Sequence, residues 1–196
     1  MEKKATYADR REKILEIATM LFYQEGYDNT SIRELSQAVE LSVAGVYYFF
    51  KDKEEILFSI LNQAIINLTT NIRNSIDEKD DPEQNIRRII KNLLGHAINH
   101  KMEIYILNRE DGRLSTEQKE TIYKHRQIAY SLIKSELVKL TKREAAESEN
   151  YSVAIFAIFS MTTWFVRWYD PKGTLTLEEI AEEMVDLFFN GYSFNR

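Results

Sequence analysis

The sequence has no cysteine and very little proline or glycine. Of its 196 residues, 2 are proline and 6 are glycine. The absence of cysteine excludes a disulfide framework and a thiolate metal site, and it suits a reducing cytoplasm. The scarcity of turn residues leaves little room for strands and hairpins, and apolar residues recur at helical spacing along almost the whole chain. The sequence therefore predicts an all-α protein.

Long hydrophobic runs are absent as well. The uncharged stretch at residues 151–166 is too short and too rich in serine and threonine to cross a bilayer. The charged start of the chain does not resemble a secretory signal peptide. We therefore expect a soluble, cytoplasmic protein with no membrane partner.

The sequence also lacks the basic excess that is typical of many nucleic-acid-binding proteins. Its formal net charge is -5, and residues 1–53 hold 8 lysines and arginines against 9 aspartates and glutamates. Bulk charge alone therefore does not indicate DNA binding. Basic residues nevertheless cluster locally, at Lys3, Lys4, Arg10, Arg11, Lys13, Lys51 and Lys53. A few well-placed cations suffice for phosphate contacts.

Residues 1–53 carry the start and stop signals of three short helices. A capping box of Thr6 and Asp9 opens the first helix, which ends near Gly26. Residues 30–34 open the second, and Ser42 caps a third that runs through residue 49. About three residues remain as the turn between the second and third helices, which is the spacing of a helix-turn-helix. The sequence predicts a three-helix head whose third helix reads DNA.

The residue types of the third helix suit contacts with DNA. Ala44 and Gly45 let the backbone approach base edges, while Tyr47 and Tyr48 offer hydroxyls to phosphates and flat rings to thymine methyl groups. Lys53 lies at the positive end of the next helix and is the best single candidate for a phosphate contact. The candidate DNA-binding residues are Thr30, Ser31, Ser42, Val43, Ala44, Gly45, Tyr47, Tyr48 and Lys53. The alternative is that Tyr47, Phe49 and Phe50 are only core aromatic residues and the lysines are only solvated charges.

Residues 41–57, together with residues 26–27 and 30–32, resemble the N-terminal signature of the TetR family of repressors. The resemblance implies a two-fold dimer whose reading helices enter successive major grooves of a pseudo-palindromic operator. It covers about residues 8–57.

Three positions depart from the pattern of that family. Glu40 stands where the family usually has a turn glycine, and Gly45 stands where a phosphate-contacting threonine is common. Phe49 replaces a frequent histidine or tyrosine. These departures concern individual contacts and leave the expected docking mode in place.

Residues 54–196 carry the apolar stripes of a larger helical bundle. Pro82 starts one of its helices at position N1, and another runs from a cap at Ser115 to about Thr141. The last third holds two strongly apolar helices, which fit an isologous four-helix dimer interface. We therefore predict a helix-turn-helix DNA-binding domain at residues 1–53 and a ligand-binding and dimerisation domain at residues 54–196.

A ligand site is suggested by polar and aromatic side chains on otherwise apolar helix faces. The candidates are Tyr105, Asn108, Arg109, Arg126, Met161, Trp164 and Arg167. Arg167 stands between aromatic pairs, where it suits a ligand carboxylate or phosphate, although an interface or surface ion pair explains it equally well. Residues 108–110, 114–115, 168–171 and 190–192 resemble a TetR subgroup that regulates lipid or steroid catabolism. That resemblance implies an acyl-CoA effector.

Catalytic and metal-binding interpretations find little support. His96 and His100 lie one helical turn apart, but no third metal ligand is evident. There is no glycine-rich phosphate loop and no triad context for the histidines, so we expect neither an enzyme nor a cofactor. We expect a ligand-responsive repressor that binds operator DNA as a homodimer. The alternative is a helical lipid-binding or protein-interaction module that does not bind DNA.

Overall fold

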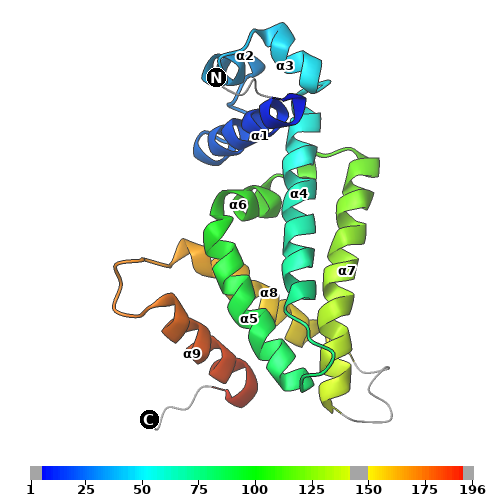
Figure 1. The fold of residues 1–196 in the computed structure, drawn as a ribbon, viewed down its shortest axis with the longest axis vertical. Helices are drawn as coiled ribbons and strands as arrows, with labels where there is room; N and C mark the ends of the chain where they lie inside the picture. The colour runs from blue at the N-terminus through cyan, green and yellow to red at the C-terminus, as the bar shows by residue number, and fades with distance from the viewer. Residues whose placement is uncertain (1–5, 142–149, 192–196) are drawn as a thin grey trace. The chain divides into compact units, whose positions relative to one another are not determined.

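The computed structural model describes residues 6–141 and 150–191, and this part of the chain is helical and holds no strand (Figure 1). The predicted all-α class is confirmed. The elements are α1 (Tyr7–Gln24), α2 (Ile32–Ala38), α3 (Val43–Phe49), α4 (Lys53–Asn74), α5 (Pro82–Asn99), α6 (Lys101–Arg109), η1 (Asp111–Arg113), α7 (Thr116–Thr141), α8 (Ser152–Trp164), η3 (Phe165–Arg167) and α9 (Leu177–Asn190).

Local hydrogen bonds set the helix starts where the sequence predicts them. The Thr6 hydroxyl accepts the backbone N–H of Asp9 at 3.2 Å, and the Asp9 carboxylate accepts the N–H of Thr6, which completes the first capping box. The Ser42 hydroxyl accepts the N–H of Gly45 at 3.0 Å. Such caps satisfy backbone donors that the first turn leaves free, and each contributes about 1 kcal/mol.

The chain divides into two compact units. The first comprises Met1–Ile65 and Met102–Tyr123, and the second comprises Ile66–Lys101 and Lys124–Arg196. Helices α4 and α7 supply residues to both units. The predicted domain division at residues 1–53 and 54–196 remains a prediction.

The first unit has an apolar core made by α1–α4. Its fully buried side chains include Ile14, Phe22, Leu35, Val46, Phe50, Ile56 and Leu57. Each such side chain stabilises the fold by roughly 1.5–3 kcal/mol relative to an exposed one. Arg11 supports the same core from its edge, because its guanidinium lies over the Phe50 ring at 4.7 Å and donates to the Ser59 hydroxyl at 3.1 Å. These contacts hold α1 against the start of α4.

The second unit is organised around α5, which packs against α8 and α9. The buried face of α5 consists of Asn85, Ile86, Ile89, Ile90, Leu93, Leu94, His96 and Ala97. At the rim, Lys91 pairs with Glu182, and the Arg87 guanidinium lies over the Phe189 ring at 4.7 Å. Within the described residues, no helix combines the length and the apolar character needed to cross a bilayer.

Candidate DNA-binding surface and effector site

The helix-turn-helix consists of α2, α3 and a tight turn between them (Figure 1). The chain reverses at Glu40, whose φ of 58° lies in the left-handed region. The Leu41 N–H closes the turn by donating to the Ser36 carbonyl oxygen at 2.9 Å. A residue with a Cβ atom is disfavoured by roughly 1–2 kcal/mol in this conformation. Glu40 is therefore strained at the position where the resemblance led us to expect glycine.

One face of α3 is buried and the other is exposed. Val46 is fully buried in the head, whereas Tyr47 and Tyr48 are 49% and 72% exposed. Val43 and Ala44 share the exposed side. The alternative in which Tyr47 is a core aromatic is therefore wrong.

Gly45 is held close to the turn that precedes α3. A Cβ atom added there would lie 3.3 Å from both the Leu41 Cβ atom and the Ser42 hydroxyl. Because this spacing is tight, a side chain at Gly45 would press on the residue that caps the helix. The absence of a side chain therefore also serves the local packing of the turn.

The structure does not bring every candidate to the exposed face of α3. The Thr30 side chain is buried, and its hydroxyl donates to the Gly26 carbonyl oxygen at 3.0 Å. The exposed Ser31 hydroxyl caps α2 by accepting the Glu34 N–H at 3.1 Å. Thr30 and Ser31 thus shape the start of α2, and their contact with DNA remains a prediction.

Lys53 is engaged with the backbone of its own head. Its ammonium donates to the carbonyl oxygens of Tyr27, at 2.5 Å, and Thr30, at 2.7 Å, and it lies 4.2 Å from the centroid of the Tyr27 ring. Partial burial lowers the pKa of Lys53, and the nearby Asp28 carboxylate acts in the opposite direction. An ammonium has three donors, so these two bonds leave one for a phosphate. The sequence had given no sign of the two carbonyl partners.

Three effector candidates lie on α6 in the first unit. The Arg109 guanidinium donates to the Tyr105 hydroxyl, and the Tyr105 ring meets the Tyr23 ring edge-on at 5.0 Å. Asn108 is exposed on the same helix. These contacts place Tyr105 and Arg109 beside α1 of the head, so the α6 candidates lie within the unit that also holds the reading helix.

In the same unit, the segment after α6 is joined to the head by polar contacts. Arg113 pairs with Asp28, which lies between α1 and α2. The Ser115 backbone N–H donates to the Glu54 carboxylate at 3.1 Å. The segment after α6 therefore contacts both the loop before α2 and the start of α4.

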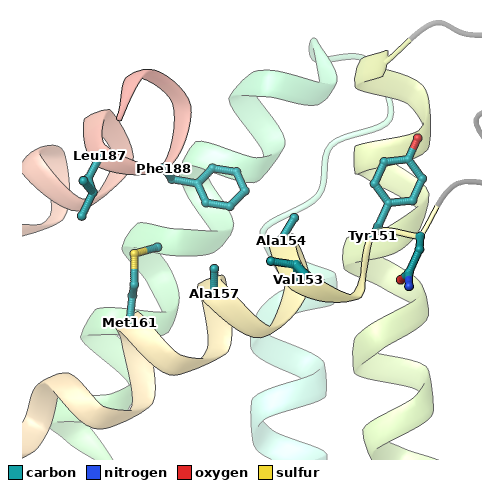
Figure 2. A pocket seen from close by; sticks show the side chains of 8 residues that line it. Tyr151, Val153, Ala154, Ala157, Met161, Leu187 and Phe188 are labelled. Carbon is teal, nitrogen blue, oxygen red and sulfur yellow. The ribbon is translucent and has the colours of Figure 1, made fainter. Parts of the chain in front are cut away.

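The other four effector candidates lie in the second unit. Arg126 is exposed on α7, and the Arg167 guanidinium lies over the exposed Trp164 ring at 4.8 Å. Met161 lines a pocket of about 610 Å³ between α8 and α9 (Figure 2). The pocket is lined by Asn150, Tyr151, Val153, Ala154, Ala157, Met161, Leu187 and Phe188. Met161 is the one predicted effector residue that lines this pocket. The sequence signal for the other lining residues was the apolar character of α8 on all its sides.

No three metal-ligating side chains gather closely enough to hold an ion in the part of the chain that the structure describes. The rings of His96 and His100 lie 4.4 Å apart. Burial, reinforced by His100, lowers the pKa of His96 to about 4. His96 is therefore a buried neutral side chain at ordinary pH.

The capped helix-turn-helix with an exposed aromatic face defines a DNA-binding regulator, and two family models match the chain. The model described as "Bacterial regulatory proteins, tetR family" matches residues 14–60, and "Tetracyclin repressor-like, C-terminal domain" matches residues 79–192. The chain therefore belongs to the TetR family of transcriptional regulators. It is not an enzyme.

Individual relatives align over nearly the whole chain. The transcriptional regulator YhgD of Bacillus subtilis is 30% identical over 95% of this chain and 98% of its own length. The transcriptional repressor KstR2 of Mycobacterium tuberculosis is 21% identical over 93% of this chain and 92% of its own. The fold is also similar to that in a crystal structure of AibR in complex with isovaleryl coenzyme A and operator DNA. The two sequences are 24% identical, and the TM-score is 0.81 over 93% of this chain and all of that chain.

Proposed function

We propose that this protein is a cytoplasmic, ligand-responsive repressor that binds a pseudo-palindromic operator as a homodimer and is released by an acyl-CoA. The observation that carries DNA binding is the exposed face of α3, where Val43, Tyr47 and Tyr48 are solvent-exposed on a head that has its own buried apolar core. Exposed aromatic and aliphatic side chains on a reading helix suit thymine methyl groups, sugars and phosphates.

The dimer is supported by apolar side chains that the second unit leaves uncovered. Val153 is 79% exposed and Phe156 60% exposed on α8, and Leu187 is exposed on α9. Val153 and Leu187 also line the pocket between the two helices (Figure 2). Large apolar side chains exposed on neighbouring helices are typical of a protein–protein interaction surface. We assign this surface to a second copy of the chain, whose side chains would fill the pocket.

The acyl-CoA effector is supported by the likeness to AibR, whose structure holds isovaleryl coenzyme A, and by the chemistry of two arginines. Arg109 on α6 and Arg167 on η3 are exposed cations beside aromatic rings. Guanidinium groups bind phosphate and carboxylate through paired hydrogen bonds. Because Arg167 lies over the Trp164 ring within the second unit, we assign Arg167 to the anionic part of the effector and Trp164 to its apolar part.

Release of DNA requires that the effector bind a DNA-incompetent arrangement more tightly than the DNA-bound one. Helix α4 is suited to couple the two events because it supplies residues to both compact units. Its first residue, Lys53, is bonded to the head. We propose that the effector acts on the reading helices through α4.

The test is a titration of a preformed complex between the protein and a labelled promoter fragment from upstream of its own gene. Acyl-CoA thioesters of several chain lengths are added, with coenzyme A alone and the matching free acids as controls. We expect release by thioesters only, with a chain-length optimum, and a weaker response from Arg167→Ala. A complex that no thioester releases rules out this effector class, and an Arg167→Ala protein that responds like wild type rules out that contact.

A further inference from the structure

Three aromatic rings meet at the end of the head where α1 begins and α3 ends. The Tyr7 ring lies 4.8 Å from the Phe49 ring and 5.9 Å from the Tyr48 ring, and the Tyr48 and Phe49 rings are 5.1 Å apart. Tyr48 meets both other rings edge-on, at interplanar angles of 75° and 89°. Such edge-to-face packing is the favoured arrangement of aromatic pairs. Each ring of this aromatic triad therefore contacts the other two.

The aromatic triad is not part of the core. Tyr7 is 53% exposed, Tyr48 is more exposed still, and only Phe49 is half-buried. The fold of the head is secured elsewhere, by its apolar core and by the contacts of Arg11 with Phe50 and Ser59. The triad thus needs an explanation other than core packing.

The backbone at Tyr7 is set by the capping box that starts α1. Tyr7 is the first residue of α1, directly after the Thr6 cap, and the capping box with Asp9 fixes that turn. An exposed tyrosine such as Tyr48 would otherwise exchange among several side-chain conformers. Packing against two fixed rings narrows that choice before DNA arrives, which reduces the conformational entropy lost on binding.

We propose that Tyr7 is a positioning residue that holds the Tyr48 ring in its DNA-binding conformation, with Phe49 as the ring that joins the two tyrosines. This inference rests on the proposed DNA binding and adds to it a residue of α1. It also gives Phe49 a role at the position where histidine or tyrosine is frequent in the family. An aromatic ring at residue 7 is required, and its hydroxyl is not.

The experiment measures the dissociation constant for the promoter fragment by fluorescence anisotropy, with thermal unfolding of every variant as a check on folding. Tyr7→Ala should weaken binding by about three- to tenfold, within the range expected when one ordered side chain is released. Tyr7→Phe should stay within about twofold, because it keeps the ring. The salt dependence should not change, because no cation is lost. The control is Tyr123→Ala, which removes an equally exposed tyrosine from α7.

A double-mutant cycle then tests whether Tyr7 acts through Tyr48. In a Tyr48→Ala background, we expect Tyr7→Ala to weaken DNA binding only slightly, because the ring that Tyr7 positions is gone. The proposal would be overturned if the losses of binding free energy were additive, or if Tyr7→Phe bound DNA as weakly as Tyr7→Ala. In either case Tyr7 would contact DNA by itself. Tyr7→Leu is the second variant in case Tyr7→Ala unfolds. Wild-type protein that does not prefer the promoter to random DNA would instead refute the proposed function.

Discussion

The ammonium group of Lys53, the first residue of α4, lies 2.5 Å from the backbone carbonyl oxygen of Tyr27, in the segment that joins α1 to α2. A second bond of 2.7 Å reaches the Thr30 carbonyl oxygen just before α2. A single side chain therefore ties the long helix α4 to the loop that leads into the helix-turn-helix.

Substitution of Lys53 by Met keeps the aliphatic stem and removes both bonds. We expect the free energy of unfolding to fall by about 1–3 kcal/mol, because two partly buried carbonyl oxygens lose their donor. If the third donor of the ammonium contacts a phosphate, the slope of log affinity against log salt should also fall by about 0.9. Urea denaturation and binding at several salt concentrations measure the two effects. Reduced stability with an unchanged salt slope would show that Lys53 makes no phosphate contact.

Replacing Glu40 by Gly should stabilise the head. The φ of 58° at Glu40 is unfavourable for any residue with a Cβ atom, and glycine adopts it freely. The gain should be about 1 kcal/mol, with the larger entropy of glycine in the unfolded chain already subtracted. Urea denaturation measures it, and Glu40→Ala is the control because it removes the side chain but keeps the strain. Equal stabilities for the two variants would contradict this account.

Charging the exposed apolar surface of α8 should dissociate the proposed dimer. Phe156→Asp is the sharpest variant, because Phe156 is exposed in the single chain and its loss leaves the buried core intact. An unpaired carboxylate in the interface should raise the dimer dissociation constant by roughly a hundredfold or more. Phe188→Asp should also yield monomer or insoluble protein, although the half-buried Phe188 packs against Phe189 and its loss disturbs the fold as well.

Sedimentation velocity at micromolar concentration distinguishes the outcomes of that experiment. Tyr123→Asp serves as the control, because it places the same charge on an equally exposed aromatic position of α7. A wild-type protein that sediments as a monomer would exclude the α8 and α9 interface.

The buried His96 should make the fold sensitive to acid. Its pKa is lowered from 6.5 to about 4 in the folded protein, by burial first and by His100 second. Between these values the unfolded chain takes up a proton that the folded chain does not, so stability present above pH 6.5 is lost as the pH falls toward 4. The His96→Gln variant should keep about 1–2 kcal/mol of the free energy of unfolding that the wild type loses over this pH range. This figure is reduced for solvent screening. Urea denaturation across this pH range checks it, and parallel profiles for the two proteins would refute it.

The helices and their ends follow from local sequence alone. Capping residues such as Thr6 and Ser42, the N1 proline Pro82, and the glycine at residue 26 act over three or four residues, so their hydrogen bonds follow from local spacing alone. The same local signals fixed the helix-turn-helix and, through it, the family resemblance. The departure at Glu40 was visible only through the family resemblance, because many tight turns use negative φ throughout and do not demand glycine.

The contacts between residues far apart in the chain could not be predicted and depend on the packing of the helices. The partners of Lys53 lie 26 and 23 residues away, and the Tyr7 ring packs against α3, two helices later. The pocket joins Met161 of α8 to Leu187 and Phe188 of α9, while the predicted effector residues divide between two packing units. Periodicity tells which face of a helix is buried but not which other element covers it. That choice is made by the packing of whole helices, which has no local signature in the chain.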